Sequence, residues 1–343
     1  MRKTVLLTGA AGFIGSNLLS YLFRKYPEYH FLVLDALTYA GNQKNIEDEI
    51  RNSGRFEFWY GDITNPYMVN ELMSRAQLVV HLAAETHVAR SIFDNTKFFQ
   101  TDVIGTQTLV NALMKNPNVE RFIHISTSEV YGTSVSDLMD EDHPLNPMSP
   151  YAGAKAGADR LVYSYWSHVD LPIVILRPFN NYGPRQHLEK MVPRFVTSAL
   201  NNEPLTVHGD GQAERDWLYV EDHCEAIDRA LHVEDFSRIK NQVINIGTGL
   251  ATSVQDVAGN LLRMLDKPDT LQKYIGDRPG QVHRHCSSVS KAKELLGWEA
   301  HTTLEEGLKK TIAWYRENEP WWREQVWMKH VPIRMANGEI EMH

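Results

Sequence analysis

The chain has 343 residues, of which 43% are hydrophobic and 23% charged, and its formal net charge is −8. This composition is ordinary for a globular protein with a large core. The acidic balance argues against a nucleic-acid partner, because such proteins carry a basic surface. It still allows an anionic small ligand, which needs only local positive charge.

Two cysteines, Cys224 and Cys286, are too few for a disulfide framework, so we expect a reducing compartment. A strand pattern begins as early as Thr4, so we expect no signal peptide before it. The sequence also contains no apolar run long enough to span a bilayer. We therefore expect a cytoplasmic protein without a membrane partner.

Short apolar runs rich in β-branched residues alternate with amphipathic stretches through the first half of the chain. The predicted strands are Thr4–Thr8, Phe31–Asp35, Phe56–Tyr60, Leu78–Leu82, Phe122–Ser126 and Ile173–Leu176. The predicted helices are Gly15–Tyr26, Thr101–Lys115 and Pro150–Val169. This alternation predicts an α/β fold, a Rossmann-type doubly wound parallel sheet with helices on both faces.

The composition of the sequence changes after about residue 178, where Pro, Gly and Asn cluster and the predicted elements become shorter. We predict that residues 1–178 form the main sheet domain, with later segments near 215–250 also contributing. Val243–Ile246 is predicted to return to the main sheet as a strand. Residues 179–330 are predicted to form mainly a smaller, interwoven C-terminal lobe, and residues 331–343 a tail.

Three glycines, Gly9, Gly12 and Gly15, stand at GxxGxxG spacing between the first strand and the first helix. Glycines there allow a tight turn and let the backbone approach a pyrophosphate at the positive end of the helix. Phe13 and Ile14 complete this turn. A plain glycine-rich turn is the alternative, but the flanking strand and helix favour a dinucleotide site.

Asp35 ends the second predicted strand, at a distance along the chain that suits a carboxylate bonding the adenosine ribose. Ala36 and Leu37 follow it, so a ribose 2′-phosphate would meet no cation. These residues predict NAD rather than NADP. Further cofactor contacts are expected where the third and fourth strands end, at Asp62, Ile63, Leu82, Ala83 and Ala84, although simple packing would also explain the last three.

Tyr151 and Lys155 are four residues apart in a predicted helix and therefore share one face. An ammonium beside a phenol is expected to lower the pKa of the phenol and make it a usable base at neutral pH. Both residues are also expected to contact the cofactor. A solvated helix pair is the alternative, since this spacing often arises by chance.

Thr127, Ser128 and Glu129 follow the fifth predicted strand, at the edge of the sheet where ligands bind in such folds. The two hydroxyls are suited to bonding a sugar hydroxyl or its developing oxyanion, and Glu129 adds a carboxylate at the same point. We expect all three to be catalytic. An acid in a surface loop is the alternative for Glu129.

Six segments give the chain a resemblance to the extended short-chain dehydrogenase/reductase family, specifically to nucleotide-sugar 4,6-dehydratases of the dTDP-glucose 4,6-dehydratase type. They are Asp35–Asn42, His81–Val88, Asn180–Pro184, Glu189–Lys190, Arg215–Asp222 and Asp277–Gly280. The resemblance implies a tightly bound NAD that is recycled within each cycle. It further implies that Tyr151 removes the proton of the C4 hydroxyl, Thr127 bonds the C4 oxygen, and Glu129 removes the C5 proton before water leaves C6.

Two residues depart from the pattern of the family. Ser128 stands where these enzymes usually carry an aspartic acid that protonates the leaving C6 hydroxyl, and Ala89 stands where an aspartate often precedes Arg90. A serine hydroxyl is too weak an acid, so Glu129 is expected to serve both steps.

The substrate is therefore left open by the sequence, between dTDP-glucose and a nucleotide-linked N-acetylglucosamine. The segments Glu141–Leu145 and Tyr182–Gln186 resemble dehydratases of the latter kind. A UDP-glucuronate decarboxylase or a 4-epimerase of the same family stays an alternative, because neither needs the missing acid. A non-catalytic NAD-binding protein is a third reading, which the intact Thr127, Tyr151 and Lys155 disfavour.

A nucleoside diphosphate calls for cations and amides in the second lobe. By family position, the expected substrate contacts are Asn181, Glu189, Lys190, Arg215 and Arg284, with Arg278 behind them. Surface ion pairs are the alternative for each arginine.

No metal is expected, because His283 and His285 would lie on opposite faces of an extended segment. The resemblance also implies a homodimer through a four-helix bundle of Thr101–Lys115 and Pro150–Val169. The apolar residues of these helices, such as Val103, Leu109, Leu161 and Val162, fit such a bundle and fit a plain core equally well.

Overall fold

Parallel strands form the main sheet of the computed structural model, which describes residues 3–276, 282–334 and 338–342. Within this part of the chain the sheet has seven strands in the order β10-β6-β5-β4-β1-β2-β3. The strands are β1 (Thr4–Thr8), β2 (His30–Asp35), β3 (Phe56–Tyr60), β4 (Leu78–His81), β5 (Arg121–Ile125), β6 (Ile173–Pro178) and β10 (Val243–Ile246). The strand order changes direction between β1 and β4, as in dinucleotide-binding folds. The predicted fold class is confirmed, including the return of β10.

Helices cover both faces of this sheet because neighbouring residues of each strand point to opposite sides. Leu7 packs with one core and Leu6 with the other. The first face carries α1 (Phe13–Lys25), α9 (Val220–His232) and α11 (Ser290–Leu296). The second face carries α3 (Pro66–Arg75), α6 (Thr106–Lys115) and α7 (Pro150–Trp166).

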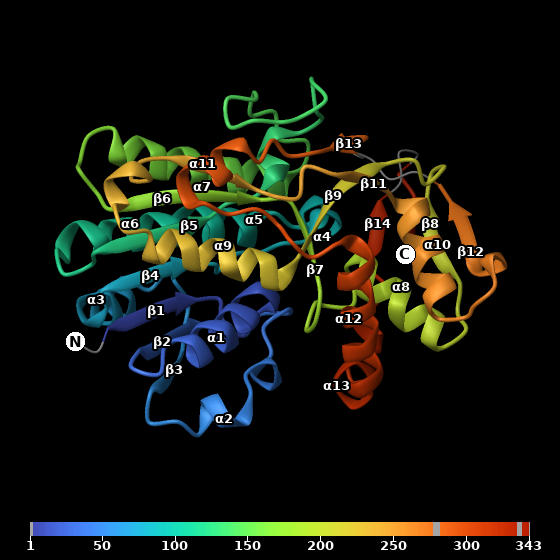
Figure 1. Cartoon of the computed structure of the whole chain (residues 1–343), viewed down its shortest axis with the longest axis horizontal. Coiled ribbons are helices and arrows are strands. Elements are labelled where there is room, and N and C mark those ends of the chain that lie inside the picture. The colour runs from blue at the N-terminus through green and yellow to red at the C-terminus, as the bar shows by residue number, and fades with distance from the viewer. Residues whose placement is uncertain (1–2, 277–281, 335–337, 343) are drawn as a thin grey trace.

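A smaller lobe lies at the other end of the molecule, with α8, α10 and β12 on the right in Figure 1. Its helices are α8 (Met191–Leu200), α10 (Val254–Met264) and α12 (Leu304–Glu317). Strand β9 (Glu214–Tyr219) pairs with β7 (Asn180–Tyr182), β11 (Ala251–Ser253) and β13 (Arg284–His285). Strand β8 (Leu205–His208) pairs with β12 (Gln272–Ile275). Buried residues of α8, α10 and α12 give this lobe a core of its own.

The chain passes between the sheet and the smaller lobe several times. It leaves after β6, returns at α9, leaves again after β10, returns at α11 and leaves for α12. The last described residues lie against the body, since Val331 packs on Ala89 and β14 (Pro332–Arg334) pairs with β15 (Ile340–Met342). The two parts are therefore interwoven.

Several short elements complete the described part of the chain. They are α2 (Asp48–Arg51), α4 (Val88–Phe93), α5 (Thr96–Phe98) and α13 (Glu319–Arg323), the 3₁₀ turns η1 (Gln43–Asn45), η3 (Ser128–Tyr131), η4 (Phe236–Arg238), η5 (Asp269–Leu271) and η6 (Val326–Met328), and the π-helix η2 (Phe99–Gly105). The helix predicted from Thr101 therefore differs from the observed one. Its first turns are π-helical and begin at Phe99, with backbone hydrogen bonds that span five residues instead of four.

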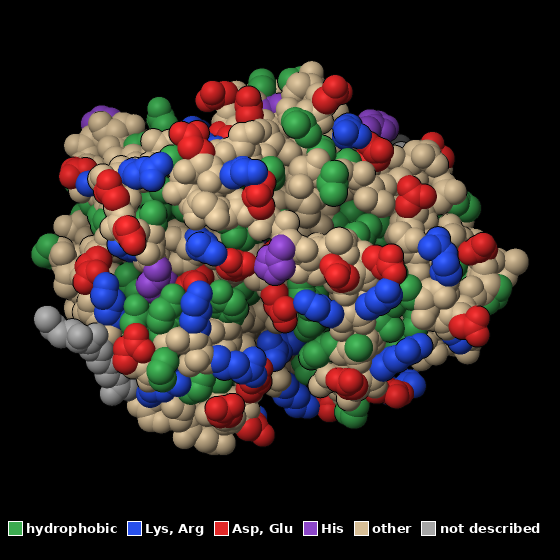
Figure 2. Space-filling model, viewed as in Figure 1, with side chains coloured by type: hydrophobic (Ala, Val, Ile, Leu, Met, Phe, Trp, Pro, Cys, Tyr) green, Lys and Arg blue, Asp and Glu red, His purple; other side chains and the backbone are tan. Residues whose placement is uncertain are grey.

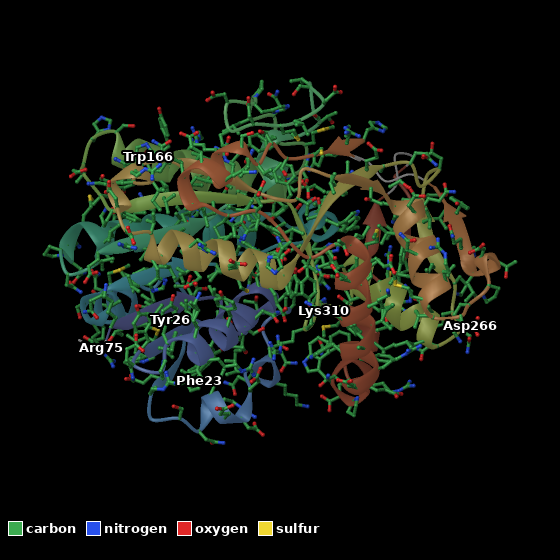
Figure 3. The ribbon with its side chains drawn as sticks, viewed as in Figure 1. Phe23, Tyr26, Arg75, Trp166, Asp266 and Lys310 are labelled. Carbon is green, nitrogen blue, oxygen red and sulfur yellow. The ribbon has the colours of Figure 1, made fainter. Side chains whose placement is uncertain are left out.

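Helices α1 and α9 are joined by a polar and aromatic contact at their ends. Tyr26 stacks on His232 with ring centroids 4.4 Å apart and donates a hydrogen bond to Asp228 Oδ1 at 2.8 Å. Figure 3 shows Tyr26 at α1, on the side toward α9. The contact fixes a helix from the first part of the chain against one that follows the excursion through the smaller lobe.

Charged side chains of both signs are interspersed over the face shown in Figure 2. Among the residues that the structure describes, none of the helices combines the length and the apolar character needed to cross a membrane.

Candidate active site

A cavity of about 440 Å³ lies beyond the carboxyl ends of β1, β4, β5 and β6 and extends into the smaller lobe. In open parallel sheets, ligands bind at this edge, beside the point where the strand order reverses. The predicted residues that line it are Gly9, Gly12, Phe13, Ile14, Gly15, Asp35, Asp62, Ile63, Leu82, Ala83, Ala84, Thr127, Glu129, Tyr151, Lys155, Asn181, Glu189, Lys190 and Arg215. Ser128 and Arg284 do not line this cavity.

The turn between β1 and α1 leaves no space for side chains at two of its glycines. Gly9 has φ +74°, and a Cβ there would lie 2.7 Å from the Ala83 backbone. A Cβ on Gly15 would lie 2.5 Å from the carbonyl oxygen of Gly9. The backbone is therefore exposed to a ligand at the start of α1, where amides and the helix dipole favour a phosphate. These residues fit the pyrophosphate of a dinucleotide.

Asp35, at the end of β2, is held by the backbone on both carboxylate oxygens. Oδ1 accepts from Leu37 N and Oδ2 from Ala11 N, each at 2.8 Å. Burial raises the pKa of Asp35, and the two amides oppose that effect. Each carboxylate oxygen keeps acceptor capacity for one more donor, which fits a ribose hydroxyl.

Helix α7 presents Tyr151 in its first turn because Ser149 caps it and Pro150 starts it. Lys155, one turn later, donates to the carbonyl oxygen of Ile125 at 2.8 Å. Both side chains are buried and line the cavity. The sequence thus places a phenol and an ammonium at the end of β5.

The pKa of Tyr151 differs from the expectation. Burial raises it, the carboxylates of Asp102 and Glu129 raise it further, and only the Thr127 hydroxyl lowers it. The prediction that Lys155 lowers the pKa of this phenol is therefore wrong for this structure. The physical reason is that the ammonium is bonded to the Ile125 carbonyl and lies in the field of Asp102.

The residues after β5 divide between the cavity and the core. Thr127 caps the turn η3, and its Oγ1 accepts from Glu129 N at 3.2 Å. Thr127 and Glu129 line the cavity, whereas Ser128 is only 2% exposed and does not. Of the two residues after Thr127, only Glu129 can therefore offer an acid to a ligand.

The far part of the cavity is built around Glu189. Its Oε2 accepts from Arg90 Nε at 2.8 Å. Burial alone would raise the pKa of Glu189, but His87, Lys190, His187 and Arg90 together lower it. The Lys190 ammonium donates to the carbonyl oxygen of Thr86 at 2.7 Å. This part of the cavity thus combines a buried carboxylate with the two cations Arg90 and Lys190 and with two histidines.

Two further predicted substrate contacts lie near β9. Arg215 is buried, and its Nη1 donates to the carbonyl oxygen of Glu214 at 2.8 Å. Asn181 donates to the carbonyl oxygen of Phe179 at 2.9 Å. Arg284 pairs instead with Glu214. Arg278 and the rest of the segment 277–280 lie outside the described residues.

Sequence reasoning missed other residues of the cavity. They include Thr38, Tyr39, Thr86, His87, Gln186, His187, Arg194, Thr206, His208, Trp217 and Val331. Most come from the smaller lobe and reach the cavity only because the chain crosses back to it. Neither spacing nor periodicity signals such residues. Within the described residues, no group of three or more His, Cys, Asp or Glu side chains is arranged to hold a metal.

Comparison with known proteins agrees with this geometry. The family model described as GDP-mannose 4,6 dehydratase matches residues 6–311. The chain is 40% identical over 326 residues to a trifunctional UDP-glucose 4,6-dehydratase/UDP-4-keto-6-deoxy-D-glucose 3,5-epimerase/UDP-4-keto-L-rhamnose-reductase of Arabidopsis thaliana, with 93% of this chain and 48% of that protein covered. The chain thus spans about half the length of this plant relative.

Solved structures that this chain covers over almost their whole length are also similar to it. The dTDP-glucose 4,6-dehydratase of Streptomyces venezuelae with NAD and TYD bound is 37% identical with a TM-score of 0.88, over 94% of this chain and 99% of that one. The UDP-glucuronic acid 4-epimerase of Bacillus cereus, in complex with UDP-glucuronic acid and NAD, is 33% identical with a TM-score of 0.86, over 92% and 99%. The resemblance inferred from the motifs is confirmed. The chain belongs to the GDP-mannose 4,6-dehydratase family, within the extended short-chain dehydrogenases/reductases.

Proposed function

We propose that this protein is an NAD-dependent nucleotide-sugar 4,6-dehydratase, which converts an NDP-hexose to the 4-keto-6-deoxy sugar. The observation that carries the proposal is the single cavity that joins the glycine turn, Tyr151 with Lys155, Thr127 with Glu129, and a cationic far end. Homologues named as 4,6-dehydratases support it over most of the chain.

The cofactor proposed is NAD, held by the glycine turn and by Asp35. When bound, it would supply a hydride acceptor at C4 that later returns the hydride to C6. The carboxylate of Asp35 suits a free ribose diol and would repel a 2′-phosphate. Recycling of the hydride requires the cofactor to stay bound, so we expect NAD to purify with the protein.

The chain's own groups would move the protons. Tyr151 takes the proton of the C4 hydroxyl, and the Thr127 hydroxyl bonds the same oxygen. Glu129 then takes the C5 proton, which the C4 ketone has made acidic. Because Ser128 is buried away from the cavity, Glu129 is also proposed to hand this proton to the leaving C6 hydroxyl. Water leaves without a second acid at position 128. When the hydride returns to C6, C5 takes up one proton, which balances the C4 hydroxyl proton that Tyr151 releases.

The substrate is proposed to be dTDP-glucose or an NDP-N-acetylglucosamine, with its diphosphate toward Lys190 and Arg215. Both cations line the same cavity as the catalytic residues. Asn181 and Glu189 lie in the same region and are proposed to bond sugar or phosphate oxygens. Arg284 would have to leave Glu214 to join them.

A 4-epimerase or a UDP-glucuronate decarboxylase is the second candidate, and the position of Ser128 favours it. Neither reaction expels water, so neither needs an acid at that place. The similar Bacillus cereus enzyme is named as a 4-epimerase. The segments around Arg215–Asp222 favour the dehydratase instead.

Liquid chromatography coupled to mass spectrometry of the products would decide between these reactions, since an epimer is separated by its retention time. The protein would be given, separately, dTDP-glucose, UDP-glucose, UDP- and GDP-N-acetylglucosamine, and UDP-glucuronate. We expect loss of one water from one neutral sugar, without net NADH. Loss of carbon dioxide from the glucuronate, or an isomer of unchanged mass, would establish the second candidate and exclude the first.

Two variants test the roles of the residues. Tyr151→Phe removes the base and should lower C4 oxidation by at least about 10²-fold. Glu129→Gln should still allow C4 oxidation but stop elimination, so that NADH accumulates in the site. NADH absorbance after substrate addition separates the two, and Tyr67→Phe, at an 87% exposed position, is the control. Normal turnover by Glu129→Gln would remove Glu129 from the mechanism.

A homodimer through η2, α6 and α7 is also proposed. Phe99, Ile104 and Tyr163 expose 44%, 48% and 46% of their surface on these helices. Leu109 and Val162 lie in the sheet core and cannot contribute to the contact. Light scattering should give twice the chain mass, and Ile104→Lys should give a monomer where Tyr67→Lys does not.

A cytoplasmic location is likewise proposed, on the ground that the buried Cys224 and Cys286 are both free thiols.

A further inference from the structure

The C-terminal segment contributes Val331 to the wall of the active-site cavity. This residue stands directly before β14 and is 3% exposed. The family model that matches the chain ends at residue 311, so this part of the wall lies outside the matched residues. The proposed mechanism gives Val331 no role, although its side chain reaches the same cavity as the catalytic residues.

The segment that carries Val331 is anchored at both ends of a crossing between the smaller lobe and the sheet. Lys329 is 1% exposed, and its ammonium donates to Glu203 Oε2, just after α8, at 2.5 Å. Two residues later, Val331 packs on Ala89 of α4, which is 4% exposed. Strand β14 then continues against α4, on the side of the smaller lobe that faces this helix in Figure 1. These contacts fix Val331 at the cavity.

The contact between Val331 and Ala89 continues to the catalytic tyrosine. Val88, the residue before Ala89, packs against a small apolar cluster that contains Tyr151. Val88, Ala89 and Val331 all line the cavity, and we call these three residues the Val331 wall. The wall begins at Tyr151, the proposed base for the C4 hydroxyl, and therefore lies at the sugar end of the substrate.

Polar groups stand beside this wall. Arg90, the residue after Ala89, donates from Nε to Glu189 Oε2 at 2.8 Å. Oε1 of the same buried carboxylate has no hydrogen-bond partner among the described residues. A sugar bound here would thus find an acceptor at Glu189 and, at the Val331 wall, side chains that neither donate nor accept a hydrogen bond.

An apolar wall favours an apolar group on the ligand, because a hydroxyl held against it would lose its hydrogen bonds to water. The ring of glucose carries only hydroxyl and hydroxymethyl substituents. An acetamido group adds a methyl group and an N–H donor, which suit the Val331 wall and Glu189 Oε1 respectively. The methyl of a thymine base does not compete for this place, since the diphosphate separates the base from the sugar.

We propose that Val331 is a specificity-determining residue, which with Ala89 and Val88 receives the methyl of an acetamido group on the sugar. The substrate is then a nucleoside diphosphate N-acetylhexosamine and not a nucleoside diphosphate glucose. This inference rests on the proposed function, because that function places C4 of the sugar at Tyr151.

Matched pairs of sugar nucleotides separate the effect of the acetamido group from that of the base. UDP-N-acetylglucosamine is compared with UDP-glucose, and the GDP and dTDP pairs likewise, by kcat/KM for the loss of water. Within the pair that is turned over fastest, the acetamido sugar should be favoured by at least about 10-fold, as expected for an apolar group in a fitting pocket. A preference for the glucose member would overturn the inference and leave the dehydratase in place.

Two variants make the wall polar without a large change of volume. Val331→Thr and Ala89→Ser should each lower the ratio of kcat/KM between acetamido sugar and glucose by about 3–10-fold, mainly through KM, with NAD affinity little changed. Val135→Thr is the matched control, because that valine is 71% exposed. An unchanged ratio in both wall variants would mean that the wall faces another group, such as the C6 methyl of the product, and would overturn the inference.

Calorimetric titration in the Tyr151→Phe background measures binding without turnover. The acetamido member of each pair should bind more tightly than the glucose member, and Val331→Thr should remove most of this advantage where Val135→Thr does not. If binding behaves in this way but the protein with Tyr151 releases water from neither sugar, the proposed dehydratase fails while the assignment of the wall stands. Equal affinity for the two members of every pair would overturn the inference whatever the reaction.

Discussion

Gly15 is the residue at which the cofactor turn is most tightly constrained. A methyl group there would meet backbone atoms of Gly9 and Ala10 at 2.5 and 2.6 Å, and neither can rotate away. The α1 helix would have to shift from β1, and with it the amides that face a pyrophosphate. The spacing of three glycines predicted this site because the constraint is local to one turn.

Gly15→Ala should therefore lower the free energy of unfolding by about 1–3 kcal/mol and weaken NAD binding. Urea unfolding and NAD titration measure the two effects. Gly259→Ala is the matched helical control, because its Cβ would meet only the Gln272 side chain at 3.7 Å. It should be neutral or slightly stabilising. Equal effects of the two variants would show that helix propensity, and not the lack of space for a Cβ, determines the effect of Gly15→Ala.

The pKa of Tyr151 shows what single-residue reasoning could not supply. The pairing of Tyr151 with Lys155 follows from their spacing on one helix. The pKa of the phenol is raised first by burial and then by the carboxylate of Asp102, which belongs to a different helix. The π-helical turn that carries Asp102 has no signature in the hydrophobic pattern, so the sequence predicted an ordinary helix from Thr101.

At the scale of elements, α7 and β6 are joined by a buried ion pair. Arg177 donates from Nε and Nη2 to the two oxygens of Asp159, each at 2.9 Å. Ser126, after β5, donates to the same carboxylate at 2.8 Å. Three elements that end at the cavity are therefore held at one point. The strands were predictable from apolar runs, but this polar contact was not, because its members are far apart in sequence.

Removing Arg177, the buried partner of Asp159, should lower the free energy of unfolding more than removing Arg160, the exposed partner. Arg177→Met leaves Asp159 without its buried guanidinium and should lower the free energy of unfolding by about 3 kcal/mol. Arg160 binds the same carboxylate but is 41% exposed, so Arg160→Met should cost less than about 1 kcal/mol. Urea unfolding of both variants gives the comparison. A smaller loss for Arg177→Met than for Arg160→Met would contradict this assignment.

This contact should also depend on pH. Burial raises the pKa of Asp159, but Arg177 and Arg160 lower it to well below its usual range. The folded chain therefore releases this proton at lower pH than the unfolded chain. The stabilisation is fully present above about pH 4 and is lost as the pH falls toward the folded pKa. Acid unfolding of Arg177→Met should accordingly begin at higher pH than that of the wild type.

At the scale of the whole molecule, the C-terminal part of the chain reaches the cofactor turn. Trp321 Nε1, on α13, donates to Asn45 Oδ1 at 2.9 Å, and Asn45 Nδ2 donates to the carbonyl oxygen of Ala11 at 2.8 Å. Ala11 N in turn donates to Asp35. The tryptophans at positions 314, 321, 322 and 327 carry no sign in the sequence that one of them supports the dinucleotide site.

Trp321→Phe keeps a ring and removes the donor, which leaves Asn45 Oδ1 buried without this bond. We expect the loss of this hydrogen bond to reduce the free energy of NAD binding by about 1 kcal/mol, which is a several-fold weaker binding of NAD. Calorimetric titration measures it. Trp327→Phe is the control, because that ring is 79% exposed on the same segment. Unchanged NAD affinity in Trp321→Phe would show that the turn needs no support from α13.

The repeated crossing of the chain between its two parts has a consequence during synthesis on the ribosome. When residue 178 emerges, six strands of the main sheet exist, but β10 and the helices α9 and α11 do not. One face, including Val5, Leu7 and Val33, then lacks part of its apolar cover until Leu296 has been made. The nascent N-terminal half therefore keeps apolar surface exposed until the rest of the polypeptide has been made. A fragment ending at residue 178 should aggregate instead of folding alone.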